Sequence, residues 1–357
     1  MTERVNRLRG LLAAKGVDAF LITRPENRYY LTGFTGTSGA VVVTRNEILL
    51  VTDFRYDEQA KAEAPRCRVL MAAGPLAETI AGLDGDLTFA SLGCEGDYIT
   101  HLQFCELRDI LPGVGVVPLS GLVEELRAVK DQAEINMIYD AVRLSDAAFR
   151  HILQFVREGV SERDLALELE FFVRKNGAEG MAFQQITASG YRSAMPHGTA
   201  SPKLLAEGEL LTMDFGAMLS GYCSDITRTV AVGRADKKME EIYSIVLEAQ
   251  MAGIAAIRQG IPASEVDRAS REVIGGYGYG ENFRHSTGHG LGLQIHENPR
   301  LSSRDDTVLK KGMVVTVEPG IYLPGWGGVR IEDTVVVEEN GCRVLTSSEK
   351  ERLMVCG

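Results

Sequence analysis

The sequence has few of the features that mark membrane, secreted or nucleic-acid-binding proteins. No apolar run approaches the ~18 residues that a membrane-spanning helix needs, and the charged N-terminal residues lead into no apolar secretory segment. Acidic side chains outnumber basic ones, 49 against 38, which leaves a formal net charge of -11. A nucleic-acid-binding surface needs a basic face instead. We therefore expect a cytoplasmic protein with neither a membrane nor a nucleic-acid partner.

Cysteine is also scarce, and its pattern is uninformative. The six cysteines are scattered, with no CxxC pair and no regular spacing, which argues against a disulfide framework. The composition, with 45% apolar and 24% charged residues, is typical of a soluble globular protein. A chain of 357 residues exceeds what one hydrophobic core usually serves, so we expect two domains.

The first part of the chain alternates between strand and helix patterns. Short apolar runs such as 18–23 and 48–51 are typical of buried strands. Helical patterns, such as 56–64 and 100–111, lie between runs of this kind. This alternation predicts an α/β domain around a mixed sheet, and we place it at residues 1–126.

The second part, residues 127–357, combines helices with hairpins and contains a faint internal repeat. Residues 205–216 and 309–320 share Leu, Gly, Thr, an acid and Gly at matching places. Each copy follows a pair of helical patterns, which lie at 131–157, 162–175, 238–259 and 263–275. We interpret the repeat as an internal duplication. Two unrelated hairpins of similar strand composition are the alternative.

Each copy of the repeat contributes an acid to a predicted hairpin. In the first hairpin, a two-residue turn at Leu219 and Ser220 would place Asp214 directly opposite Asp225. Like charges that face each other destabilise a sheet. A divalent cation would compensate, because carboxylate oxygens are good ligands for such ions.

The second hairpin repeats this arrangement. If it is centred on Gly325, Glu318 lies opposite Glu332, and Arg330 shares their face two residues along. Each acid alone would fit a solvated strand position. Two hairpins that both pair acids across apolar strands instead indicate a site.

Histidine is rare but concentrated. Four of the six histidines fall between residues 197 and 296, and His289 lies in the glycine-rich segment GHGLG (288–292). Glycines let the backbone approach a site closely. With the four acids, a neutral His289 nitrogen completes the ligand set of a two-metal hydrolase that activates water.

These motifs resemble the pita-bread metallopeptidases, which include methionine aminopeptidase, aminopeptidase P and prolidase. The resemblance rests on Asp214, Asp225, GHGLG (288–292), EPGIY (318–322) and RIED (330–333). Other segments resemble the Xaa-Pro branch and its creatinase-like N-terminal domain: YLTGF (30–34), TDFRY (52–56), LRAVK (126–130), SGYRSAMPHG (189–198) and GGVRIED (327–333). The implied fold is an α/β creatinase-like domain followed by an α+β pita-bread catalytic domain with an internal pseudo-twofold repeat.

The resemblance also implies a metal centre. Asp225 and Glu332 would bridge two divalent metal ions, Asp214 would complete the shell of one ion, and His289 and Glu318 that of the other. Manganese is the expected metal, with cobalt or zinc as alternatives.

Further roles follow from the resemblance. Glu318 is the expected general base, and His197 and His296 match positions that contact the substrate and the tetrahedral intermediate. His285, Phe183 and Arg300 are expected to bind substrate. Their alternatives are a structural hydrogen bond for His285, a core position for Phe183 and a surface position for Arg300. The remaining expected supports are Tyr322 and Arg330.

The expected reaction is metal-dependent hydrolysis of a bond between an N-terminal residue and proline. The loop 34–39 lacks the Asp and His that some dipeptidases insert into a partner's active site, which favours an Xaa-Pro aminopeptidase. Arg300 would suit the carboxylate of a dipeptide, so an Xaa-Pro dipeptidase (prolidase) is the alternative. A catalytically silent binding module of the same fold is the alternative of another class. The expected partners are proline-containing peptides and, by resemblance, a second copy of the chain in a homodimer.

Overall fold

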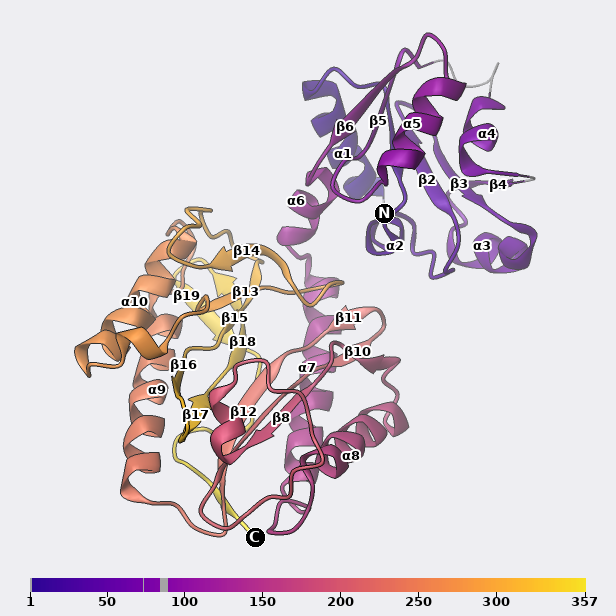
Figure 1. The fold of residues 1–357 in the computed structure, drawn as a ribbon. Coiled ribbons are helices and arrows are strands. Elements are labelled where there is room, and N and C mark those ends of the chain that lie inside the picture. Colours follow the sequence, from indigo (N-terminus) through magenta and orange to yellow (C-terminus); the bar gives the residue numbers. More distant parts are fainter. Residues whose placement is uncertain (1, 73, 84–88) are drawn as a thin grey trace. The chain divides into compact units, whose positions relative to one another are not determined.

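The computed structural model describes residues 2–72, 74–83 and 89–357, and the chain separates into two compact units between Arg127 and Ala128. The first unit contains one mixed sheet in the strand order β4-β3-β2-β1-β5-β6 (Figure 1). Strands β1, β5 and β6 run parallel, as do β3 and β4, whereas β2 is antiparallel to both of its neighbours. The predicted α/β domain is therefore confirmed. Its strands are β1 (Ala19–Ile22), β2 (Ala40–Thr44), β3 (Ile48–Thr52), β4 (Arg68–Met71), β5 (Ser91–Glu95) and β6 (Gly115–Leu119), and its helices are α1 (Thr2–Ala14), α2 (Pro25–Thr32), η1 (Phe54–Tyr56), α3 (Asp57–Glu63), α4 (Leu76–Ala81), α5 (His101–Ile110) and α6 (Leu122–Ala128).

The second unit places its strands between two pairs of helices. Helices α7 and α8 lie on one side of the strands, and α9 and α10 lie on the other (Figure 1). No helix in the described ranges is long and apolar enough to cross a membrane. The helices are α7 (Gln132–Ile152), α8 (Glu162–Lys175), η2 (Gly190–Ala194), α9 (Lys237–Ala256), α10 (Ala263–Gly276) and η3 (Gly280–Asn282). The strands are β7 (Gly180–Met181), β8 (Ile186–Ser189), β9 (Leu210–Phe215), β10 (Ala217–Leu219), β11 (Tyr222–Cys223), β12 (Ile226–Val232), β13 (Gly288–Gly290), β14 (Glu297–Leu301), β15 (Val314–Val317), β16 (Gly320–Leu323), β17 (Gly327–Arg330), β18 (Asp333–Glu338), β19 (Gly341–Val344) and β20 (Val355–Cys356).

Side-chain caps fix where the long helices begin. The Asp131 carboxylate accepts a hydrogen bond from the Glu134 backbone N–H, and the Glu134 side chain accepts one from the Asp131 N–H, which forms a capping box at α7. Ser161 caps α8 and Asp236 caps α9 in the simpler one-bond form. These caps satisfy backbone donors that would otherwise have no partner in the helix.

The internal repeat predicted from the sequence is present in the fold. Strands β9 and β15 both follow a helix pair and a tight turn, in which Gly208 and Gly312 have φ values of 80° and 89°. Both strands are buried along their whole length. An acid emerges near the end of each copy, Asp214 within β9 and Glu318 directly after β15. The duplication thus delivers one carboxylate from each half.

The first hairpin differs from the prediction by one residue in its turn. The turn is at Ser220 and Gly221, with φ values of 52° and 75°, and Asp214 lies opposite Thr227. Asp225 therefore lies diagonally across from Asp214, in the break between β11 and β12. The physical reason is that such a turn needs positive φ at both central residues, which suits Gly221 far better than Leu219.

The second hairpin has the predicted register. Gly320 lies opposite Arg330 in β16 and β17, and Val317 lies opposite Asp333 in β15 and β18. Glu318 and Glu332 fall in the interruptions between these paired segments. Their backbone N–H groups donate to Thr287 and Thr227 instead of to each other. Each acid is therefore anchored through its backbone to a further segment, Glu318 to Thr287 just before β13 and Glu332 to Thr227 in β12.

Candidate metal centre

The predicted site residues gather around one cavity of the second unit. The cavity has a volume of about 430 Å³. Tyr322 is not part of the lining, but its hydroxyl accepts a hydrogen bond from Arg330. The predicted residues that line the cavity are Phe183, His197, Asp214, Asp225, His285, His289, His296, Arg300, Glu318, Arg330 and Glu332.

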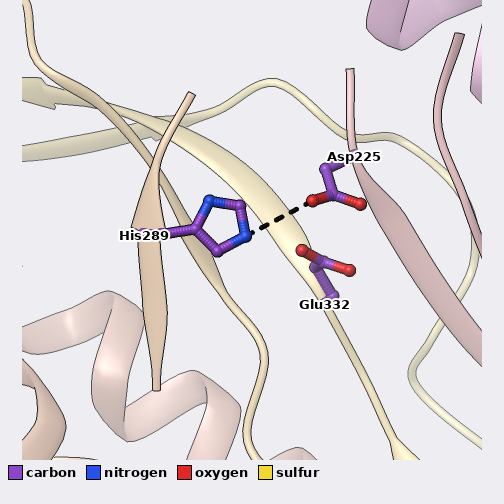
Figure 2. A group of neighbouring side chains, drawn as sticks. All are labelled: Asp225, His289 and Glu332. Atoms are coloured by element: carbon purple, nitrogen blue, oxygen red, sulfur yellow. Dashed lines mark ion pairs between the residues drawn. The ribbon is translucent and has the colours of Figure 1, made fainter. Parts of the chain in front are cut away.

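Three of these side chains form a compact cluster with metal-ligating atoms. Asp225, His289 and Glu332 each offer one ligand atom, and these atoms all lie within 4.8 Å of one another (Figure 2). His289 Nε2 is 3.5 Å from an Asp225 oxygen and 3.3 Å from a Glu318 oxygen. The imidazole nitrogen therefore faces at least three carboxylates that come from separate segments of the second unit.

The backbone of β13 fixes the direction of the His289 ring. Its Nδ1 lies 3.0 Å from the Gly290 carbonyl oxygen, so a proton on Nδ1 leaves Nε2 free as a ligand. Burial and the neighbouring His296 lower the pKa of His289 to about 4, so the ring is neutral at pH 7. A Cβ at position 288 would overlap the Thr316 carbonyl group. That overlap explains why a glycine precedes the histidine.

The buried acids are incompletely paired, which is what a cation site requires. Asp225 Oδ1 and Glu332 Oε1 are buried and accept no hydrogen bond within the described ranges. Burial and the neighbouring acids raise the pKa values of Asp225 and Glu332 well above their usual range. Burial, followed by the nearby Asp214, raises the pKa of Glu318 to about 8. Buried like charges are costly without a counter-charge, so oxygen and imidazole ligands here fit a divalent metal.

Asp214, which also lines the cavity, is paired with an arginine. Arg330 Nη2 donates to Asp214 Oδ2 at 2.5 Å, and both side chains are almost fully buried. Arg330 Nη1 donates to the Tyr322 hydroxyl at 2.7 Å and to the Pro196 carbonyl at 3.2 Å. One guanidinium thus orients an acid, a phenol and the backbone of a loop that lines the cavity.

His285 lies at the far end of this hydrogen-bond chain. Its Nε2 is 2.8 Å from the Tyr322 hydroxyl and its Nδ1 is 2.8 Å from the Ser286 carbonyl oxygen. Burial, with smaller effects of nearby cations, lowers the pKa of His285 to about 3. The neutral ring then donates through Nδ1 and accepts from Tyr322 through Nε2. His285 therefore lines the cavity and also makes the structural hydrogen bond that was its alternative.

The remaining predicted residues lie around the mouth of the cavity. His197 and His296 are exposed, and the His296 ring packs edge-on against His289 at 4.3 Å between centroids. Arg300 in β14 lies directly opposite His289 in β13. Phe183 is half-buried and lines the cavity, so it is not a core residue.

Two threonines support the site and were missed by the sequence analysis. The Thr227 hydroxyl donates to Glu332 at 2.7 Å and accepts from Arg330 Nε. The Thr316 hydroxyl donates to Glu318 at 3.2 Å and accepts from the His289 backbone N–H. The sequence could have indicated Thr316 as a site residue, because a threonine precedes the acid by two residues in both copies of the repeat.

We expect Arg330→Lys to weaken metal binding. A lysine retains the charge, but its single ammonium cannot reproduce the fork that reaches Asp214, Tyr322 and Pro196. The affinity for Mn²⁺ is expected to fall about 10- to 100-fold, as for other residues that orient metal ligands. Calorimetric titration measures this, with the exposed Arg304→Lys as the matched control. An unchanged affinity would show that Arg330 does not orient the ligands.

Comparison with known proteins agrees with this architecture. A creatinase/prolidase N-terminal domain model matches residues 4–129, and a metallopeptidase family M24 model matches residues 136–339. The chain is 39% identical to the Xaa-Pro dipeptidase of Pyrococcus furiosus, over 99% of this chain and 100% of that protein.

Solved structures give the same result. The structure of an Xaa-Pro dipeptidase from Bacillus anthracis is 47% identical, with a TM-score of 0.97 over 99% of both chains. An X-Pro aminopeptidase from Thermotoga maritima is 40% identical, with a TM-score of 0.90 over 95% of this chain and 98% of that one. The creatinase-like and pita-bread fold inferred from the sequence is confirmed. The chain belongs to metallopeptidase family M24.

Proposed function

We propose that this metallopeptidase is an Xaa-Pro dipeptidase, which hydrolyses dipeptides that end in proline. The observation that carries the proposal is Arg300, a cation at the mouth of the cavity directly opposite His289. Within the described ranges its guanidinium makes no hydrogen bond or ion pair, so it is available to a free carboxylate. The loop 34–39 favours an aminopeptidase from the sequence alone. The Pyrococcus furiosus and Bacillus anthracis relatives, both named Xaa-Pro dipeptidases, support the alternative better.

The proposed metal ligands are the five residues that the resemblance implied: Asp214, Asp225, His289, Glu318 and Glu332. Two divalent cations, with manganese expected, would activate water and stabilise the negative charge that develops on the scissile carbonyl. Two carboxylate oxygens, Asp225 Oδ1 and Glu332 Oε1, accept no hydrogen bond from the described residues, and the His289 imidazole is neutral; both observations support this assignment.

Glu318 is proposed to move the proton. Its carboxylate lies next to His289 and lines the cavity, so it could accept a proton from the attacking water and release it to the leaving proline nitrogen. His197 and His296, which are exposed and line the cavity, would contact the substrate. Phe183 offers an apolar wall for the proline ring, whose nitrogen carries no hydrogen to donate.

The substrate length is tested by comparing one Xaa-Pro dipeptide with the matching Xaa-Pro-Yaa tripeptide on the metal-loaded enzyme. We expect kcat/KM to be clearly higher for the dipeptide, since only its carboxylate can reach Arg300. A preference for the tripeptide would overturn the dipeptidase proposal. It would favour the aminopeptidase function that the name of the Thermotoga maritima relative describes.

Substituting Arg300 tests the carboxylate contact itself. Arg300→Ala is expected to raise KM for the dipeptide about 10- to 100-fold, with a smaller effect on kcat, because a charge-assisted pair is lost in both ground and transition states. The nearby exposed Arg304→Ala is the control and should leave KM unchanged. If both variants behave alike, Arg300 does not read the substrate carboxylate.

A further inference from the structure

A single buried glutamate ties together the loop of residues 189–201, hereafter the pocket loop. Glu162, the first residue of α8, is fully buried. Its Oε1 accepts hydrogen bonds from the backbone N–H of Ser189 at 2.7 Å and from the Ser189 hydroxyl at 2.9 Å. Its Oε2 accepts from Arg192 Nε at 3.0 Å, from the N–H of Ser201 at 3.1 Å and from the Ser201 hydroxyl at 2.6 Å. Since the two serines are the ends of the pocket loop, one carboxylate closes it.

The pocket loop carries part of the cavity lining. Pro196, His197 and Thr199 all line the cavity. Arg192, held by Glu162, also donates from Nη2 to the Thr199 carbonyl at 2.5 Å. None of the five proposed metal ligands lies on the pocket loop, so its position can change without removing a ligand.

The charge of Glu162 matters to these contacts. All five partners are donors, and hydrogen bonds to an ionised carboxylate are roughly twice as strong as those between neutral groups. The position at the start of α8 adds the favourable field of a helix N-terminus. An amide of the same shape would turn an NH₂ group toward donors and lose bonds at one end of the pocket loop.

We propose that Glu162 is a positioning residue, which sets the pocket loop and thereby places His197 against the substrate. The inference deepens the proposed function, because it depends on His197 contacting the reacting dipeptide. Glu162 itself lies outside the cavity lining and acts only through the pocket loop.

Hydrogen exchange tests the first step without any substrate. Glu162→Gln is expected to raise amide exchange in a peptide covering residues 189–201 by about tenfold or more, because two of its amides donate to this carboxylate. The control is Glu95→Gln in the first unit, where a buried carboxylate accepts from the backbone N–H groups of Thr23 and Arg24 in the same manner. Unchanged exchange of the pocket loop in Glu162→Gln would overturn the proposal.

A double-mutant cycle tests the second step. Glu162→Gln and His197→Ala should each lower kcat for an Xaa-Pro dipeptide by about 10- to 100-fold, with KM changed less than about threefold. The double variant should be within about threefold of His197→Ala alone, because both changes remove one contribution. The Mn²⁺ affinity of all three variants should stay within about threefold of the wild-type value. If the loss of kcat in the double variant equals the product of the losses in the two single variants, Glu162 acts independently of His197 and the proposal is overturned.

A milder change guards against a folding failure. Arg192→Gln removes a donor from the pocket loop, while Glu162 keeps its four bonds to the serines. It should therefore raise amide exchange in residues 189–201 and lower kcat, both by less than Glu162→Gln does. A wild-type enzyme that cleaves no Xaa-Pro dipeptide would overturn the proposed function. The exchange result would then still decide whether Glu162 holds the pocket loop.

Discussion

Asp225→Asn is expected to lower the turnover of Xaa-Pro dipeptides by about 1,000-fold or more and to abolish tight metal binding. Asp225 is buried, its Oδ1 has no partner within the described ranges, and its Oδ2 faces His289. Asparagine retains the shape but removes the charge that a pair of cations needs. A thousandfold loss corresponds to about 4 kcal/mol of transition-state stabilisation. Steady-state kinetics and calorimetric Mn²⁺ titration measure both effects.

Asp225→Asn should not lower the stability of the metal-free protein, although it lowers turnover and metal binding. Without metal, the variant is expected to be at least as stable as wild type, because burial and the neighbouring acids disfavour the charged form of Asp225 and asparagine carries no charge at any pH. Asp146→Asn is the matched control, since Asp146 is equally buried but accepts its hydrogen bonds from Ser347 and Ser348. It should lose stability and keep its metal affinity. Wild-type turnover in Asp225→Asn would refute the metal site.

Removal of divalent metal with a chelator is expected to abolish turnover and to make stability depend on pH. Burial raises the pKa of Glu318 from 4.5 to about 8, so between these values the folded metal-free protein binds more protons than the unfolded chain. The stabilisation is complete below pH 4.5 and is lost as pH rises toward 8. Each such group lowers the free energy of unfolding by about 1.4 kcal/mol per pH unit.

Denaturant unfolding at several pH values tests this slope. Asp225 and Glu332 have raised pKa values as well and should steepen it. Glu318→Gln should flatten the slope, because a neutral amide does not titrate. Addition of Mn²⁺ should reverse the slope above pH 6, since metal binding competes with protons. A metal-free protein whose stability rises between pH 5 and 8 would contradict the charge arrangement described above.

The sequence was sufficient to predict the elements that are determined by neighbouring residues, such as helix caps and turns. The helix over residues 162–175 was predicted at its observed bounds, since Ser161 is a cap and the apolar spacing is helical. The second hairpin was also predicted in register, because its glycine-rich turn between Leu323 and Gly327 leaves few ways to pair the strands. The sequence motifs around His289, Glu318 and Glu332 were sufficient to predict most of the residues that line the cavity.

What the sequence could not provide are contacts between distant segments. Glu162 meets Ser201 across 39 residues, and Thr227 meets Glu332 across 105 residues, so neither pair leaves a periodic signal. The first turn was misplaced because alternation alone does not say which residues adopt positive φ, and Ser220 does so without being glycine. The sequence alone could not decide whether Arg300 lies on the surface or at the site, because its position opposite His289 depends on the pairing of two strands.

The number of metal ions that the chain binds is the most direct test of the account. Metal-free protein is dialysed against Mn²⁺, and the bound metal is measured by elemental analysis. The five proposed ligands predict two ions per chain in the wild type and a loss of bound metal in Asp225→Asn. A wild-type chain that binds no Mn²⁺, Co²⁺ or Zn²⁺ under these conditions would contradict the proposed metal centre and the dipeptidase chemistry that depends on it.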